Sequence, residues 1–185
     1  MNVKKYMKFN ILDGIIDVLN QKEKFRMKPH IQIQNTSNNT TIIQKEESYL
    51  TKIAELKKSS DFRGVYQLLD ELSEKEDHEM ITKACDERLW RKTNGLNKSN
   101  VLHVACDEGN LRLVKSLIDC GCDKEVKNND GYTPLIIASS SGKLNVVKYL
   151  VSIGANKEAR DNFGCTPFSV ATGNVKKYLK SIGVK

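Results

Sequence analysis

Residues 130–160 read DGYTPLIIASSSGKLNVVKYLVSIGANKEAR, and the pattern in this stretch recurs on both sides of it at a constant spacing. The five residues that begin at Gly131 (GYTPL) return at Gly164 as GCTPF, 33 positions later. The same spacing backwards relates Leu135, Ala138, Gly142, Leu144, Val147, Leu150 and Gly154 to Leu102, Ala105, Gly109, Leu111, Val114, Leu117 and Gly121. A fixed period of this length predicts structural units that stack on one another.

Each unit has the sequence features of two helices joined by a turn. Thr133 before Pro134 predicts a helix start, because the hydroxyl accepts a free backbone N–H and proline fits the first helical position. Gly142 is placed to end this helix, where a left-handed backbone favours glycine. A second, outer helix carries the apolar stripe Leu144, Val147, Leu150 and Val151. One unit alone leaves a face uncovered, so its neighbours must complete the core.

This period and this order of residue types resemble the ankyrin repeat, a turn followed by two antiparallel helices. The resemblance covers residues 95–185 and divides them into units at 95–127, 128–160 and 161–185. It implies an all-α fold, an ankyrin-type α-solenoid of stacked helix-turn-helix repeats with short β-turn tips.

Two of the three units depart from the pattern. In the first, Lys98, Asn100 and Val101 occupy the Gly, Thr and Pro positions. The third lacks four residues around its inter-helix turn, so we expect its first helix or its loop to be shortened. In its second helix Lys180 replaces Val151, which is typical of a solvent-facing C-terminal cap. A chain cut short during gene decay is the alternative interpretation.

Residues 44–94 are predicted to form a helical N-terminal cap that precedes the repeats. A helix is expected around residues 45–58, and residues 61–90 have the apolar spacing of a helical hairpin. The hairpin lacks the Thr-Pro start and both glycines of the repeats. We therefore interpret it as a cover for the open face of the first repeat.

Two further segments precede this cap. Residues 1–28 are predicted to contain a basic amphipathic helix, which either docks on a surface or packs against the rest of the protein. Asp13 and Asp17 interrupt its apolar run, so we do not expect a signal peptide, a membrane span or a membrane-bound helix. Residues 29–43 are rich in Asn, Thr and Ser and are predicted to be a flexible linker.

The positive charge is concentrated at the ends of the chain. The net charge is +7, with a surplus of four in residues 1–28 and another four in residues 172–185, while the segment between them sums to −1. Binding of nucleic acid or another acidic surface by these ends is the alternative function. The balanced charge of the repeats does not favour it.

Cysteine usage predicts a reducing compartment. The chain has five cysteines, an odd number without the spacing of a disulfide framework. Together with the absence of an export signal, this indicates an intracellular protein, in the cytoplasm, with the nucleus left open.

The sequence predicts no catalytic, cofactor or metal site. Ser141-Gly142-Lys143 lacks the first glycine and the final Ser or Thr of a phosphate-binding loop. Four residues have the types of metal ligands, namely His103, Cys106, Cys120 and Cys122. None of the cysteine pairs has a zinc-knuckle gap, and the ankyrin resemblance makes His103 a structural residue. We therefore expect core thiols and a non-enzymatic protein.

The ankyrin resemblance implies a protein-binding module or adaptor whose turn tips and inner helices line a concave groove. Transferred onto this chain, the partner-binding positions are Lys127, Asn129, Asp130, Tyr132, Arg160, Asn162, Phe163 and Cys165 on the tips and Asp107, Glu108, Ser140 and Ser141 on the inner helices. Tyr132 and Phe163 are the expected anchors, because exposed aromatic side chains on a rigid backbone dominate many interfaces. The sequence does not identify the partner protein.

Overall fold

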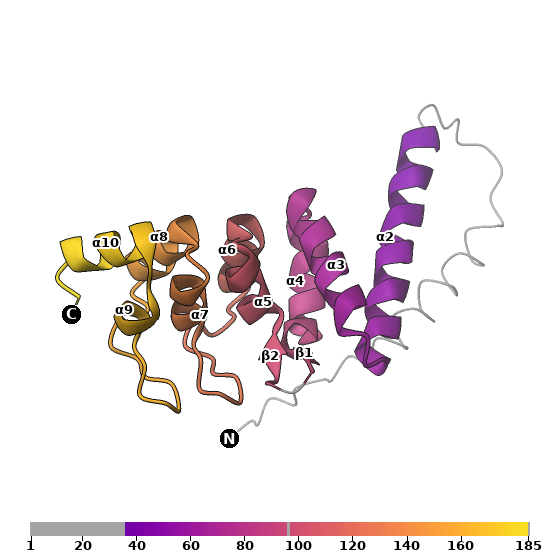
Figure 1. Ribbon diagram of the computed structural model, residues 1–185. Helices are drawn as coiled ribbons and strands as arrows, with labels where there is room; N and C mark the ends of the chain where they lie inside the picture. Colours follow the sequence, from indigo (N-terminus) through magenta and orange to yellow (C-terminus); the bar gives the residue numbers. More distant parts are fainter. Residues whose placement is uncertain (1–35, 96, 185) are drawn as a thin grey trace, which may run out of the picture. The chain divides into compact units, whose positions relative to one another are not determined.

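The computed structural model describes residues 36–95 and 97–184 (Figure 1). The helix predicted in residues 1–28 therefore lies outside the described residues. The chain divides into two compact units, Met1–Thr41 and Ile42–Lys185, and the repeats lie in the second.

Three consecutive helix pairs form the repeats of the second unit. The first helices of the pairs are α5 (Val101–Glu108), α7 (Pro134–Ser140) and α9 (Pro167–Val170), and the second helices are α6 (Leu111–Asp119), α8 (Leu144–Ser152) and α10 (Gly173–Ser181). The first helices pack in a row, α5 on α7 and α7 on α9, and the second helices form a parallel row. Figure 1 shows the pairs side by side in chain order, which confirms the predicted all-α, ankyrin-type solenoid.

Polar caps set where the first helices begin. The Thr133 hydroxyl accepts from the N–H of Ile136, with Pro134 at the first helical position, as predicted. Asn100 replaces the threonine in the first repeat and forms a capping box with His103, in which each side chain accepts the other residue's backbone N–H. The degraded opening of this repeat therefore still has a complete helix cap.

The core runs through the pairs at equivalent positions. Leu117, Leu150 and Leu179 are fully buried, one in each second helix. Ala105 and Ala138 are also fully buried, because they lie where neighbouring first helices approach closely. Each layer therefore depends on its neighbours for burial of its apolar side chains.

The four missing residues of the third repeat shorten its first helix. Helix α9 spans only Pro167–Val170, compared with Pro134–Ser140 for α7. Ala171 has an extended backbone (φ −70°, ψ 143°) and leads directly to α10. The loss therefore falls on the last turn of the helix and on the glycine turn after it. Lys180 is exposed on α10.

Helices also precede the repeats. They are α2 (Thr36–Lys58), α3 (Phe62–Glu74), α4 (His78–Asp86) and the 3-10 turn η2 (Leu89–Arg91), after which β1 (Thr93–Asn94) pairs antiparallel with β2 (Ser99–Asn100). Helix α3 packs on α6, and η2 contacts α3, α4 and α5. Asp70 of α3 accepts hydrogen bonds from Asn110 (2.8 Å) and Arg112 (3.0 Å), which joins this layer to the first repeat.

Helix α2 differs from the sequence prediction at its start. It begins at Thr36, so residues 36–43, predicted as part of a flexible linker, are helical. Tyr49, Ile53 and Leu56 are buried farther along the same helix. Extending a helix costs far less than nucleating one, so a packed segment can carry a polar extension whose own composition does not favour helix. No helix among the described residues combines the length and apolarity needed to cross a bilayer.

Candidate protein-binding groove

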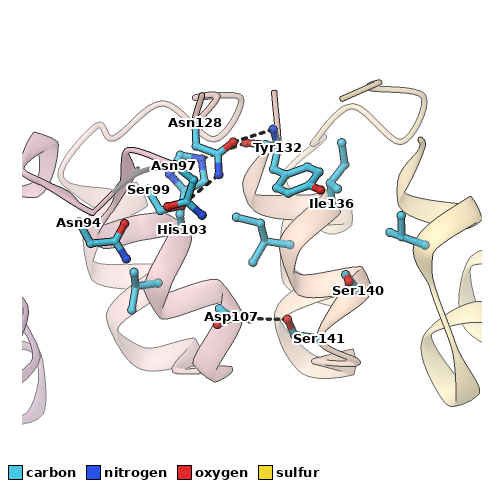
Figure 2. A pocket seen from close by; sticks show the side chains of 13 residues that line it. Asn94, Asn97, Ser99, His103, Asp107, Asn128, Tyr132, Ile136, Ser140 and Ser141 are labelled. Atoms are coloured by element: carbon cyan, nitrogen blue, oxygen red, sulfur yellow. Dashed lines mark hydrogen bonds between the residues drawn. The ribbon is translucent and has the colours of Figure 1, made fainter. Parts of the chain in front are cut away.

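A groove of about 280 Å³ runs along the first helices and the turn tips of the repeats (Figure 2). Its lining comes from β1, the β1–β2 turn, β2, α5, the tip before α7, α7 and α9. The residues are Asn94, Asn97, Ser99, His103, Val104, Asp107, Asn128, Tyr132, Ile136, Ile137, Ser140, Ser141 and Val170. Amides and hydroxyls therefore surround an aliphatic floor.

The tips are held by a hydrogen-bond pattern that repeats every 33 residues. The Asn128 side-chain oxygen accepts from the backbone N–H groups of Asp130 and Tyr132, both at 3.0 Å, and Asp161 does the same for Phe163 and Cys165 at 2.8 Å. Successive tips are also joined through their backbones. The N–H of Asn129 donates to the carbonyl of Asn97 (2.9 Å), and that of Asn162 donates to the carbonyl of Asp130 (3.0 Å). The tip wall of the groove is therefore a rigid surface.

His103 fixes the corner where α5 meets the next tip. Its Nδ1 accepts the N–H of Asn100 (3.1 Å), so Nε2 carries the proton and faces the carbonyls of Val126 (3.0 Å) and Tyr132 (3.1 Å). The ring is 1% exposed. Burial lowers the pKa of His103 below its usual 6.5, although the two carbonyls oppose this shift. His103 is thus a neutral structural residue, as the ankyrin resemblance implied.

The end of the groove opposite the tips is acidic. The Ser141 hydroxyl of α7 donates to the carboxylate of Asp107 on α5, and Figure 2 shows the two facing each other. Glu108 accepts a hydrogen bond from the Tyr66 hydroxyl. Both carboxylates are exposed, and neither forms an ion pair within the described part of the chain.

The structure brings only part of the predicted binding set into this groove. Asp107, Tyr132, Ser140 and Ser141 line it. Glu108 follows Asp107 outside the lining, and the remaining positions are on the tips: Lys127, Asn129, Asp130, Arg160, Asn162, Phe163 and Cys165. Several of these tip residues bind neighbouring tips. Lys127 donates to the Arg160 carbonyl (3.0 Å) and Asn162 to the Asn129 carbonyl (2.8 Å), whereas Arg160 donates to the Gly164 carbonyl (2.8 Å) within its own tip.

The two predicted aromatic anchors lie in different settings. Tyr132 is half-buried and lines the groove, and desolvation raises the pKa of its phenol. Phe163 is 73% exposed at the tip before α9 and does not line the groove. Their roles as anchors remain predictions.

Several lining residues were not predicted from the sequence. Val104, Ile137 and Val170 form the apolar floor, and they are spaced by the same 33-residue period. Comparing equivalent positions of the three first helices at this period would have found them. Asn94 and Asn97 precede the first repeat where its pattern is degraded, so no repeat signal points to them.

Four of the five cysteines lie in two places in the described structure. Cys106 is fully buried in α5, and burial raises the pKa of its thiol. Cys85 of α4 instead meets Cys120 and Cys122 after α6; hydrogen bonding to Cys120 lowers the pKa of Cys85, but bonding to Cys122 and burial outweigh this and raise it to about 12. In residues 36–95 and 97–184 no group of three or more His, Cys, Asp or Glu side chains is placed to hold a metal ion.

Stacked helix pairs with a groove along their first helices define a helical repeat protein. The family model for ankyrin repeats, in three copies, matches residues 60–182. The chain belongs to the ankyrin-repeat family. The match begins at residue 60 and so includes α3 and α4, whereas the sequence resemblance was recognised only from about residue 95. Comparison with curated proteins gives no match.

Proposed function

We propose that this protein is a non-enzymatic adaptor that binds a partner protein through the groove along α5, α7 and α9. Ankyrin repeats are in general protein–protein interaction modules. The observation that carries the proposal is the groove itself, a hollow of about 280 Å³ with an aliphatic floor and a rigid polar rim. Such a surface offers shape, apolar contact and directed hydrogen bonds, the features of a specific interface.

Filling the groove tests this proposal. Ser140 is exposed on α7 and lines the groove, so Ser140→Trp places a large side chain there without disturbing the core. Asn145 is exposed on α8 outside the lining, which makes Asn145→Trp the matched control. Photo-crosslinking in cells is then compared between these variants and the original chain.

We expect Ser140→Trp to lose the crosslinked proteins that the original chain and Asn145→Trp both recover. Equal recovery by all three would show that partners use another surface. Circular dichroism of the purified variants checks that each is folded.

A further inference from the structure

One acceptor in the groove lacks a partner. The side-chain oxygen Oδ1 of Asn94 is buried, and it has no hydrogen-bond partner among the residues that the structure describes. A buried acceptor left unsatisfied is unfavourable, because it has lost its hydrogen bonds to water. Figure 2 shows Asn94 at one side of the groove, near Ser99 and Asn97. If the side chain turns so that this oxygen faces the groove, a ligand that presents an N–H satisfies it.

The groove carries a negative charge and no positive one. Asp107 is the only lining residue with a formal charge at neutral pH, since His103 is held neutral and the other polar side chains are amides and hydroxyls. Glu108 follows it outside the lining, where its carboxylate accepts from the Tyr66 hydroxyl of α3. Neither carboxylate has an ion-pair partner within the described residues. Asp107 keeps acceptor sites beyond the one that Ser141 occupies. The lining at this end therefore favours a cation over an acid, although the side chain of Lys143 lies over Gly109 nearby.

The floor between these two features is apolar. Val104, Ile137 and Val170 are each half-buried and come from three successive first helices. The volume of about 280 Å³ lies just below the usual range for small-ligand pockets. It accommodates a few side chains of a short segment better than a folded element.

We propose that the groove binds an extended peptide segment of the partner that is aliphatic and uncharged except for one Lys or Arg. Its backbone N–H donates to Asn94 Oδ1, an aliphatic side chain packs on Ile137 and Val170, and the basic residue reaches Asp107, with Glu108 adding negative charge outside the lining. This inference rests on the proposed function and specifies the chemistry of the bound segment. An acidic segment or a nucleic-acid strand would place like charge against Asp107.

The test begins with the selection of random displayed peptides on the immobilised full chain. The selected peptide is synthesised, and its affinity for the chain is measured by isothermal titration calorimetry. We expect selected sequences to contain Lys or Arg among aliphatic residues and to lack Asp and Glu. Ser140→Trp should abolish binding, and Asn145→Trp should leave it unchanged.

Two groove variants separate the two polar contacts. The double variant Asp107→Asn/Glu108→Gln should weaken binding by about tenfold at low salt and remove most of its salt dependence. Asn94→Leu should weaken binding by about three- to tenfold, as expected for one hydrogen bond, without changing the salt dependence.

A charge exchange keeps the test independent of how well any single variant folds. A peptide with its basic residue changed to Glu should bind the original chain poorly and recover affinity for Asp107→Lys/Glu108→Lys. Enrichment of acidic peptides, indifference to the acidic pair, or no enrichment at all overturns this proposal but leaves the proposed function standing. If peptide binding and the crosslinks both survive Ser140→Trp, this proposal and the proposed function are both overturned.

Discussion

His103 shows how much of a repeat's geometry one side chain can determine. It accepts the N–H that starts α5 and faces two carbonyls of the following tip, so it joins a helix start to the next layer. Accepting this N–H requires the neutral ring, because a proton on Nδ1 would confront the N–H of Asn100, whereas Nε2–H can donate to the carbonyls in either protonation state.

Stability is therefore expected to depend on the charge of His103. Its folded pKa lies below 6.5, so above that pH the ring is neutral in both states and its contribution is complete. Below pH 6.5 the unfolded chain binds the proton first, and the free energy of unfolding falls as the pH approaches the lower, folded pKa. Urea unfolding from about pH 7.5 to about pH 5.5 measures this loss.

The matched control is His103→Gln, which removes the titrating ring but keeps polar atoms at the same position. Its unfolding free energy should vary less across this pH range than that of the original chain, since carboxylate titrations are common to both. Equal pH dependence in the two proteins would assign the effect to other groups.

Truncation of Leu150 should lower the free energy of unfolding more than truncation of an exposed leucine. Leu150 is fully buried in α8, so Leu150→Ala removes apolar contacts and leaves a cavity. We expect a loss of about 2–5 kcal/mol in the free energy of unfolding. Leu50→Ala offers the same chemical change at a side chain that is 41% exposed, with an expected loss within about 0.5 kcal/mol. Chemical denaturation of both variants gives the comparison.

At this scale the sequence predicted buried repeat positions better than groove contacts. Val147 and Leu150 of the predicted apolar stripe are fully buried, because apolar periodicity reports burial directly. Asn94 was not predicted, since its unpartnered oxygen arises from the way β1 meets the first repeat and no local pattern encodes that.

At the scale of elements, the helices before the repeats behave as a layer of the stack. Ser73 of α3 shares a hydrogen bond of 2.9 Å with Ser116 of α6, and Leu68, Leu69 and Leu72 on the same helix are fully buried. The apolar side of the first repeat thus depends on this layer for cover.

Deleting residues 44–94 should therefore damage the repeats that remain. We expect the fragment 95–185 to show reduced helicity by circular dichroism and to lose cooperative unfolding, because its first layer is left without a neighbour. The chain from residue 44 to 185 is the control and should unfold cooperatively. Full helicity and a sharp transition in the 95–185 fragment would refute the capping role.

Element boundaries were predicted where a residue type fixes the backbone. Thr133-Pro134 marks the start of α7, and the gap in the third repeat correctly indicated a shortened element. The start of α2 was not predicted, because a polar segment becomes helical through continuity with a packed one, and composition alone does not carry that information.

For the whole chain, the groove exists only because layers stack. Asn94 belongs to β1 and Val170 to α9, the first helix of the third repeat, yet both line the groove. A family resemblance predicts such a groove in outline. The side chains that meet in it follow from how the layers pack, which is why most of the lining was identified only in the structure.

Charge at the ends of the chain gives the last prediction. The net charge is +7, and exposed lysines of α10 (Lys176, Lys177 and Lys180) contribute to it. Scattered exposed charges are screened over about 8 Å at physiological ionic strength, so we expect the full chain to elute from heparin below about 0.15 M salt. Lys177→Gln/Lys180→Gln should elute earlier, whereas Ser140→Trp should elute with the original chain, because groove binding and charge at the ends are separate properties. Retention well above physiological salt that disappears on removing residues 1–28 would instead favour a nucleic-acid or acidic-surface function.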